Sequence, residues 1–342
     1  MIALARSNIV KQTMQDTRGT SALAARYVAG ENPEASVSRA ATLLMQHKIH
    51  SSLFYLGEYV DRPLLVSENV AAKLAVVEKL GHADLDVHVS VDPTQIGQSI
   101  NAEQARRNAF AIAEAIARSA AGRPGFHALM LDMEDESVVN STIALHDDLR
   151  AARLPVALTL QAYLRRTEGD LQAQIARGSR VRLVKGAFAV GTRVAFTRQG
   201  AIKTNFRHLI ELMLSRQARE AGFYPVIATH DDHLHAHAIE HAEGNGWHPS
   251  EFEFEMLVGV RDNVARAWPR AVTKCASTYH LDATGGPMRC AASAKIRATL
   301  GCSHAHSCVP LERTTRRHVI EEDWLTAAYG TKLTPTFAPL RA

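Results

Sequence analysis

The sequence lacks any long apolar run. None of its 342 residues falls in a stretch that approaches the roughly 18 to 20 apolar residues of a membrane-spanning helix. The start, Met1–Gln15, has early positive charge but no long apolar core and no small-residue cleavage site, so it does not resemble a secretion signal. The formal net charge is only +4, and the clustered basic stripe of a nucleic-acid-binding protein is missing. We therefore expect a globular, cytoplasmic protein that does not bind nucleic acid.

Cysteine is absent from most of the chain, because all four cysteines lie in the last quarter. They are Cys275, Cys290, Cys302 and Cys308. The last three, with His304 and His306, could imitate a zinc cluster, but the paired short spacings of a zinc site are missing. We expect no metal there. The sharp break in composition indicates instead that the tail differs in origin from the body.

Apolar runs of β type alternate with helical stretches along the body. The runs are Leu53–Leu56, Val87–Val91, Ala128–Leu131, Val156–Leu160, Val181–Val184, Val226–Ala228 and Phe252–Leu257. A long helical stretch, Ser21–His47, precedes them. Near-continuous apolar strands joined by helices are typical of a parallel sheet that is covered on both faces. Seven of them predict an α/β fold, a (βα)8 TIM-like barrel with N-terminal helices.

Polar and charged residues stand where these strands end, which is where such a barrel keeps its chemistry. They are Gly57-Glu58, Asp92, Asp132–Asp135, Gln161, Lys185–Phe188, Thr229–Asp231 and Glu255. Arg182 and Lys185 stand three apart on one strand, so a regular strand points them to opposite faces. Spacing alone therefore leaves a shared role open.

Six ordered motifs carry a resemblance to a known family. They are Phe54–Glu58, Leu131–Asp135, Leu160–Leu164, Val184–Ala187, Ala228–Asp231 and Glu253–Leu257. Together they resemble the proline dehydrogenase family, monofunctional FAD-dependent enzymes. The resemblance implies that Asp132 and Arg182 are catalytic. It also implies FAD contacts from Met133, Gln161, Lys185, Gly186, Ala187, Thr229 and His230.

The reaction that this resemblance implies is the oxidation of L-proline to 1-pyrroline-5-carboxylate, the first step of proline catabolism. Electrons would pass from FAD to a quinone, which leaves room for a peripheral membrane contact. The oligomeric state is not defined by the sequence. Asp92 falls at a substrate-binding position where the family commonly shows a Lys near the proline carboxylate. An Asp reverses that charge and should repel the carboxylate.

The carboxyl-terminal region departs further from the family after about Arg261. Family members continue with a last strand and with a helix whose two arginines grip the proline carboxylate. Lys274–Pro310 does not match this pattern. Reverse translation of Lys274–Ala305, with the last base of each codon joined to the first two of the next, permits the missing family sequence, arginine pair included. Our hypothesis is a reading-frame change between Arg261 and Lys274.

Three regions follow from this hypothesis: an N-terminal helical arm (1–50), the barrel (51–264) and an aberrant tail (265–342). With its last strand and helix disrupted, the barrel should lack an eighth strand. Its first and seventh strands should then keep unpaired edges. Activity should be impaired by loss of the substrate clamp.

Other interpretations stay open. The chain could be a non-catalytic remnant of the family, or a barrel lyase that uses Lys185 as a Schiff-base lysine. It could also be a metal enzyme, since the chain holds a histidine group of His230, His233, His235, His237, His241 and His248. An exposed polar helix face also explains those histidines. The acidic residues Glu134–Glu136, Asp231 and Asp232 also fit simple helix capping.

Overall fold

A computed structural model of the protein describes residues 28–30, 32–55, 60, 62–188, 190–260 and, for the backbone, 274–281. Its strands are β1 (Val28–Gly30), β2 (His50–Tyr55), β3 (His88–Val91), β4 (Ala128–Leu131), β5 (Val156–Gln161), β6 (Arg180–Val184), β7 (Tyr224–Ala228), β8 (Glu253–Leu257) and β9 (Lys274–Leu281). Its α-helices are α4 (Pro33–His47), α5 (Pro63–His82), α6 (Ala102–Ala120), α7 (Val139–Ala151), α8 (Thr167–Ala176), α9 (Gln199–Met213), α10 (Arg216–Glu220) and α11 (Asp232–Gly244). Two 3-10 helices, η1 (Pro93–Ile96) and η2 (Glu136–Val138), follow β3 and β4.

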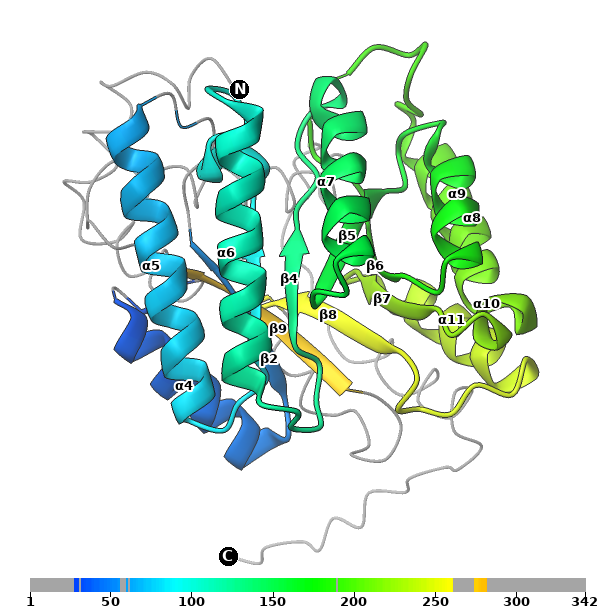
Figure 1. Ribbon diagram of the computed structural model, residues 1–342. Helices are drawn as coiled ribbons and strands as arrows, with labels where there is room; N and C mark the ends of the chain where they lie inside the picture. Colours follow the sequence, from blue (N-terminus) through cyan, green and yellow to red (C-terminus); the bar gives the residue numbers. More distant parts are fainter. Residues whose placement is uncertain are drawn as a thin grey trace, which may run out of the picture. The chain divides into compact units, whose positions relative to one another are not determined.

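All strand pairings in the sheet are parallel, in the order β1-β9-β2-β3-β4-β5-β6-β7-β8, and β9 also pairs with β8. Strands β2 to β9 therefore close on one another as a barrel, with helices on the outside (Figure 1). The predicted TIM-like barrel and all seven predicted strands are confirmed. None of the described helices is long and apolar enough to cross a membrane.

The expectation of unpaired strand edges is wrong. β9 pairs with β2 from His50↔Ala276 to Tyr55↔Leu281, and with β8 from Glu253↔Lys274 to Leu257↔Thr278. Strand pairing uses backbone N–H and C=O groups, which every residue except proline supplies. Lys274–Leu281 contains no proline, so it can take the closing position although its sequence differs from the family pattern.

The expectation of one continuous helix over Ser21–His47 is also wrong. Val28–Gly30 forms β1, which pairs with His280 and Leu281 of β9. α4 begins only at Pro33, because the Asn32 side chain accepts a hydrogen bond from the Ala35 backbone N–H and so caps the helix start. The N-terminal part of the predicted arm lies outside the described residues, as do Gly57-Glu58, Arg261 and the tail beyond Leu281.

The barrel strands bury apolar side chains on their outer face and polar side chains on their inner face. Outward-facing residues such as Leu129, Leu158 and Leu183 are fully buried in a large apolar cluster that the helices complete. Inward-facing residues are more polar. Ser90, Thr159 and Arg182 are all buried on the inner side of β3, β5 and β6. This alternation follows from the two-residue period of a strand. It leaves hydrogen-bonding groups inside the barrel.

Candidate functional site

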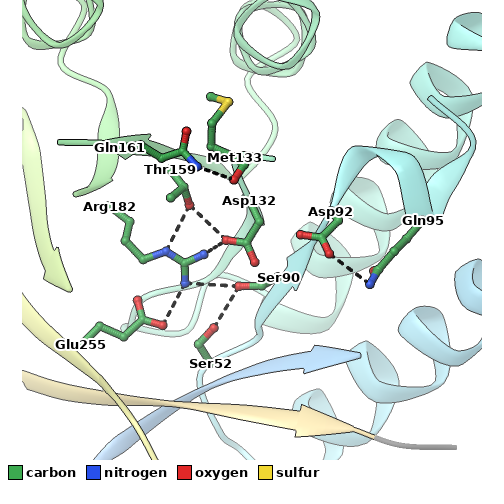
Figure 2. Close-up of polar contacts among 10 residues, drawn as sticks. All are labelled: Ser52, Ser90, Asp92, Gln95, Asp132, Met133, Thr159, Gln161, Arg182 and Glu255. Carbon is green, nitrogen blue, oxygen red and sulfur yellow. Dashed lines mark hydrogen bonds and ion pairs between the residues drawn. The ribbon is translucent and has the colours of Figure 1, made fainter. Parts of the chain in front are cut away.

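A buried cluster of charges lies at the carboxyl-terminal mouth of the barrel, the end at which the strands finish (Figure 2). Arg182 Nη1 lies 2.9 Å from Glu255 Oε1, and Arg182 Nη2 donates to Asp132 Oδ1. Arg182 Nε donates to Thr159 Oγ1 at 3.1 Å, and Thr159 in turn donates to Asp132 Oδ1 at 3.2 Å. The side chains thus converge from β4, β5, β6 and β8.

One guanidinium serves two carboxylates in this cluster. The side chains of Arg182 and Glu255 are 5% and 2% exposed, whereas that of Asp132 is 18% exposed. Asp132 is therefore the member that reaches furthest towards solvent. With one positive and two negative groups, the cluster carries a net negative charge when all three are ionised. Such buried ions are tolerated only when they are paired and hydrogen-bonded.

Gln161 is tied to the loop after β4. Its Nε2 donates to the backbone carbonyls of Met133 and Glu134 at 3.0 and 3.2 Å. Gln161 Oε1 is buried and has no hydrogen-bond partner among the described residues. A buried acceptor without a partner is unfavourable, so it marks a place where a ligand N–H would be stabilised. The structure thus brings Asp132, Met133, Gln161 and Arg182 together.

The Lys185-Gly186-Ala187 segment follows β6 and rests against Tyr163. Gly186 has φ +98, and a Cβ there would lie 2.1 Å from the Tyr163 ring, so only glycine fits. The Tyr163 N–H also donates to the Lys185 carbonyl at 3.0 Å. Lys185 is half-buried and Ala187 is exposed. The loops after β5 and β6 are therefore held together by backbone hydrogen bonds. No interaction between the side chains of Lys185 and Arg182 is found among the described residues.

Thr229 and His230 follow β7 and support the neighbouring loop. His230 Nε2 accepts a hydrogen bond from the Leu257 backbone N–H at 3.0 Å, which places the proton of the neutral ring on Nδ1. Thr229 Oγ1 accepts from the Asp231 N–H at 3.2 Å. His230 is thus linked to the end of β8, two residues beyond Glu255.

Asp92 is 2% exposed at the end of β3 and lies beside a buried lysine. Gln95 Nε2 donates to the Tyr55 carbonyl at 2.7 Å and lies 3.4 Å from Asp92 Oδ2. Lys73 Nζ of α5 donates to Gln95 Oε1 at 2.7 Å. Burial lowers the pKa of Lys73 to about 7, and the charge of Asp92 opposes that shift. Asp92 thus lies near a lysine from α5. The position of Lys73 in the sequence did not indicate this.

The acidic run after β4 divides between two roles. Asp135 accepts from the Ser137 N–H at 2.8 Å and caps η2, as the capping interpretation predicts. Glu134 does not cap. Its carboxylate accepts from the Thr94 N–H at 3.0 Å and from Thr94 Oγ1 at 2.6 Å, which ties the loops after β3 and β4 together. Asp231 caps α11 by accepting from the His233 N–H.

No group of three or more described His, Cys, Asp or Glu residues is placed to hold a metal ion. His233 and His237 do lie on α11, but His237 Nε2 is 3.0 Å from Glu211 and His233 is exposed. The buried residues that sequence reasoning missed are Ser90, Thr159, Lys73 and Gln95. For Ser90 and Thr159 the available signal was the two-residue period, since both lie two positions before a predicted strand-end residue.

Comparison with known proteins gives consistent results. The pattern of the family described as proline dehydrogenase matches residues 37–283. The chain is 28% identical over 245 residues to Proline dehydrogenase 2 of Bacillus subtilis (strain 168), covering 71% of this chain and 76% of that protein. It is 29% identical over 246 residues to a Deinococcus radiodurans protein named proline dehydrogenase, with the same shares covered.

Among solved structures, the chain resembles proline utilization A (PutA) from Bdellovibrio bacteriovorus inactivated by N-propargylglycine. The TM-score is 0.68 at 17% identity, over 82% of this chain and 33% of that one. The chain thus spans about a third of that larger protein. At this level of identity the likeness concerns the fold.

Proposed function

Because the chain belongs to the proline dehydrogenase family, we propose that the mouth of its barrel binds FAD and oxidises L-proline to 1-pyrroline-5-carboxylate. Oxidation of proline is the first step of proline catabolism. The observation that carries the site assignment is the ion cluster of Arg182, Asp132 and Glu255 on the inner side of the barrel. A barrel interior that served packing alone would have no need of such a cluster.

The residues at the mouth fit a flavin. Gln161 Oε1 is a buried acceptor without a described partner. We assign FAD contacts to Met133, Gln161, Lys185, Gly186, Ala187, Thr229 and His230. When bound, FAD accepts a hydride from the carbon beside the substrate nitrogen.

Asp132 is the group that we assign to the substrate amine. Its Oδ1 is fixed by Arg182 and Thr159, while Oδ2 makes no hydrogen bond to a described residue. Oδ2 is therefore available to accept an N–H of the ring nitrogen. The negative charge of the cluster attracts the cationic secondary amine to the mouth. Oδ2 can take the extra proton of that amine, because hydride leaves only from the carbon beside a neutral nitrogen. Arg182 orients the Asp132 carboxylate, which holds the substrate for reaction.

We further propose a quinone as the electron acceptor and the cytoplasm as the location. The quinone follows from the family reaction, which requires an acceptor for two electrons.

The test is flavin absorbance and dye-linked proline turnover of the purified full chain. We expect bound flavin in the wild type, and retained flavin with at least about a hundredfold loss of turnover in Asp132→Asn. Arg219→Gln, which removes an exposed arginine from α10, is the matched control and should behave as wild type. Absence of flavin from folded protein, or unchanged turnover in Asp132→Asn, would contradict the proposal.

We also propose that turnover is impaired by a reading-frame change before Lys274, which removes the arginine pair from the tail. The support is the reverse translation of Lys274–Ala305. DNA sequencing of codons 261 to 275 tests the idea directly. Restoring the proposed frame should lower KM for proline at least tenfold. Codons that cannot yield the paired arginines would contradict the proposed reading-frame change. They would leave the flavin assignment unaffected.

A further inference from the structure

A cavity opens at the amino-terminal end of the barrel, where the strands begin. It measures about 700 Å³ and is lined by the ends of α6 and α7 and by the first residues of β5 and β6. The parallel strands run from this end to the mouth, so the cavity lies at the other end of the barrel from Asp132 and Gln161. Its volume is within the range of small-ligand sites.

Three arginines line this cavity: Arg150, Arg153 and Arg180. None of them lies within salt-bridge distance of a described carboxylate. Asp147 of α7 is already engaged by Arg177 Nη1 at 2.9 Å. Three cations around one hollow repel one another, and this repulsion is relieved when an anion binds among them.

The hydrogen bonds of these arginines leave donors for a ligand. Arg180 Nη1 donates to the His127 carbonyl at 2.8 Å, and its guanidinium stacks 5.2 Å from the Phe126 ring centre. Arg150 Nη2 donates to the Arg177 carbonyl. Each guanidinium has five N–H groups, so most of them are still unpaired in the described part of the chain. Arg153 is exposed and donates to no described residue.

His146 adds a different requirement to the same cavity. The ring lines the cavity and is fully buried, with Nδ1 3.1 Å from Asp147 Oδ1. Burial lowers the pKa of His146, so the ring is neutral near pH 7 and carries its proton on the Nδ1 that faces Asp147. Nε2 is then an acceptor, and it has no partner among the described residues. A donor from a ligand would satisfy it.

We propose that this cavity is a binding site for a small polyanion that carries a hydroxyl group, of the hydroxy-tricarboxylate type. Arg150, Arg153 and Arg180 bind its carboxylates, and the hydroxyl donates to His146 Nε2. Ala117, Ala120 and Leu154 provide apolar wall for the carbon skeleton. Binding at this end of the barrel stabilises the folded chain without contact to the mouth.

The same arginines have a simpler possible role. α6 and α7 both end at this cavity, and helix carboxyl ends carry partial negative charge that nearby arginines offset. If that were their whole role, replacing one would change stability in ligand-free buffer and would leave no specific anion binding to lose. Ligand titration therefore separates the two roles.

The experiment is calorimetric titration of the full chain with citrate, and with tricarballylate, which is citrate without its hydroxyl group. We expect one citrate per chain at micromolar to millimolar concentration and about tenfold weaker binding of tricarballylate. Arg153→Gln should weaken citrate binding at least tenfold. Arg216→Gln, which removes an exposed arginine from α10, should change it less than twofold.

Three results would overturn the proposal. The first is no citrate binding at ten millimolar by chain that is folded by circular dichroism. The second is equal loss of binding in Arg153→Gln and Arg216→Gln, which would mean attraction to net charge alone. The third is equal binding of citrate and tricarballylate. Proline turnover is not part of the readout, so the result is independent of the function assigned to the mouth.

Discussion

The two faces of β6 bury side chains of opposite character. Leu183 points outward into the apolar layer beneath the helices, where it is fully buried. Arg182, one residue earlier, points inward to Asp132 and Glu255. The outer face stabilises the barrel by removing apolar surface from water. The inner face buries charges that do not stabilise a fold by themselves, so it reflects the demands of a site.

The largest effect is expected from Arg182→Met. Removing the guanidinium leaves Asp132 and Glu255 buried without a counter-cation, which costs about 4 kcal/mol of unfolding free energy. Urea unfolding followed by circular dichroism measures the loss.

Arg182→Lys is the control for this prediction, since it keeps one positive charge in the same place. It should lose less stability than Arg182→Met but also lose turnover, because lysine cannot bond Asp132, Thr159 and Glu255 together. Equal stability of Arg182→Met and wild type would mean that the inner face is not held by this ion cluster.

A somewhat smaller effect is expected from Leu183→Ala on the outer face. The cavity left in the apolar layer should cost about 3 kcal/mol. This variant should keep its flavin, and the pH dependence of its turnover should be unchanged, at temperatures where it is folded. Loss of flavin from folded Leu183→Ala would show that the two faces are not functionally separate.

The third prediction concerns the buried Lys73, whose pKa is lowered to about 7 by burial. The unfolded value is about 10.4, so the unfolded chain binds more protons between these pH values and stability rises with pH. The stabilising contribution is complete above the unfolded pKa and is lost as pH falls through 7. Relative to Lys73→Met, the wild type should gain about 1 kcal/mol per pH unit between pH 8 and 9.5.

Urea unfolding of both proteins over that range provides the measurement, and the shared titrations cancel in the difference. A constant difference would mean that Lys73 keeps its ordinary pKa in the folded chain.

The smallest effect is expected from Arg219→Gln. Arg219 Nε lies 3.1 Å from Glu251, but both side chains are more than a third exposed. Exposed pairs contribute less than about 1 kcal/mol, and salt screens them. Half-molar sodium chloride should erase the difference from wild type in urea unfolding. A loss as large as that of Arg182→Met would remove the distinction between buried and exposed pairs.

Much of the fold was predictable from the sequence, because apolar runs such as Val156–Leu160 and Val181–Val184 can only be buried strands at this length. The family followed from the ordered motifs. The strand at Val28–Gly30 was not predictable, since three residues carry no periodicity and their partner, β9, lies some 250 residues away. Long-range pairing, rather than local preference, decides such a segment.

Part of the site was also predictable, because some of its residues stand at the ends of the predicted strands. Asp132 and Gln161 stand at strand ends, where the barrel geometry itself points to chemistry. Lys73 lies in the middle of α5 and gives no such signal. Its place beside Gln95 and Asp92 depends on how α5 packs against η1, which the helical pattern does not define.

Closure of the barrel by β9 has a consequence for the assembly of the protein. β9 pairs with both β2 and β8 through main-chain groups. A segment of the chain after Val260 connects β8 to β9. The position between β2 and β8 can therefore be filled by an extended peptide of the length of β9. A chain ending after β8 and a separate peptide spanning Lys274–Leu281 should therefore reassemble when mixed, so the protein could be supplied as two pieces.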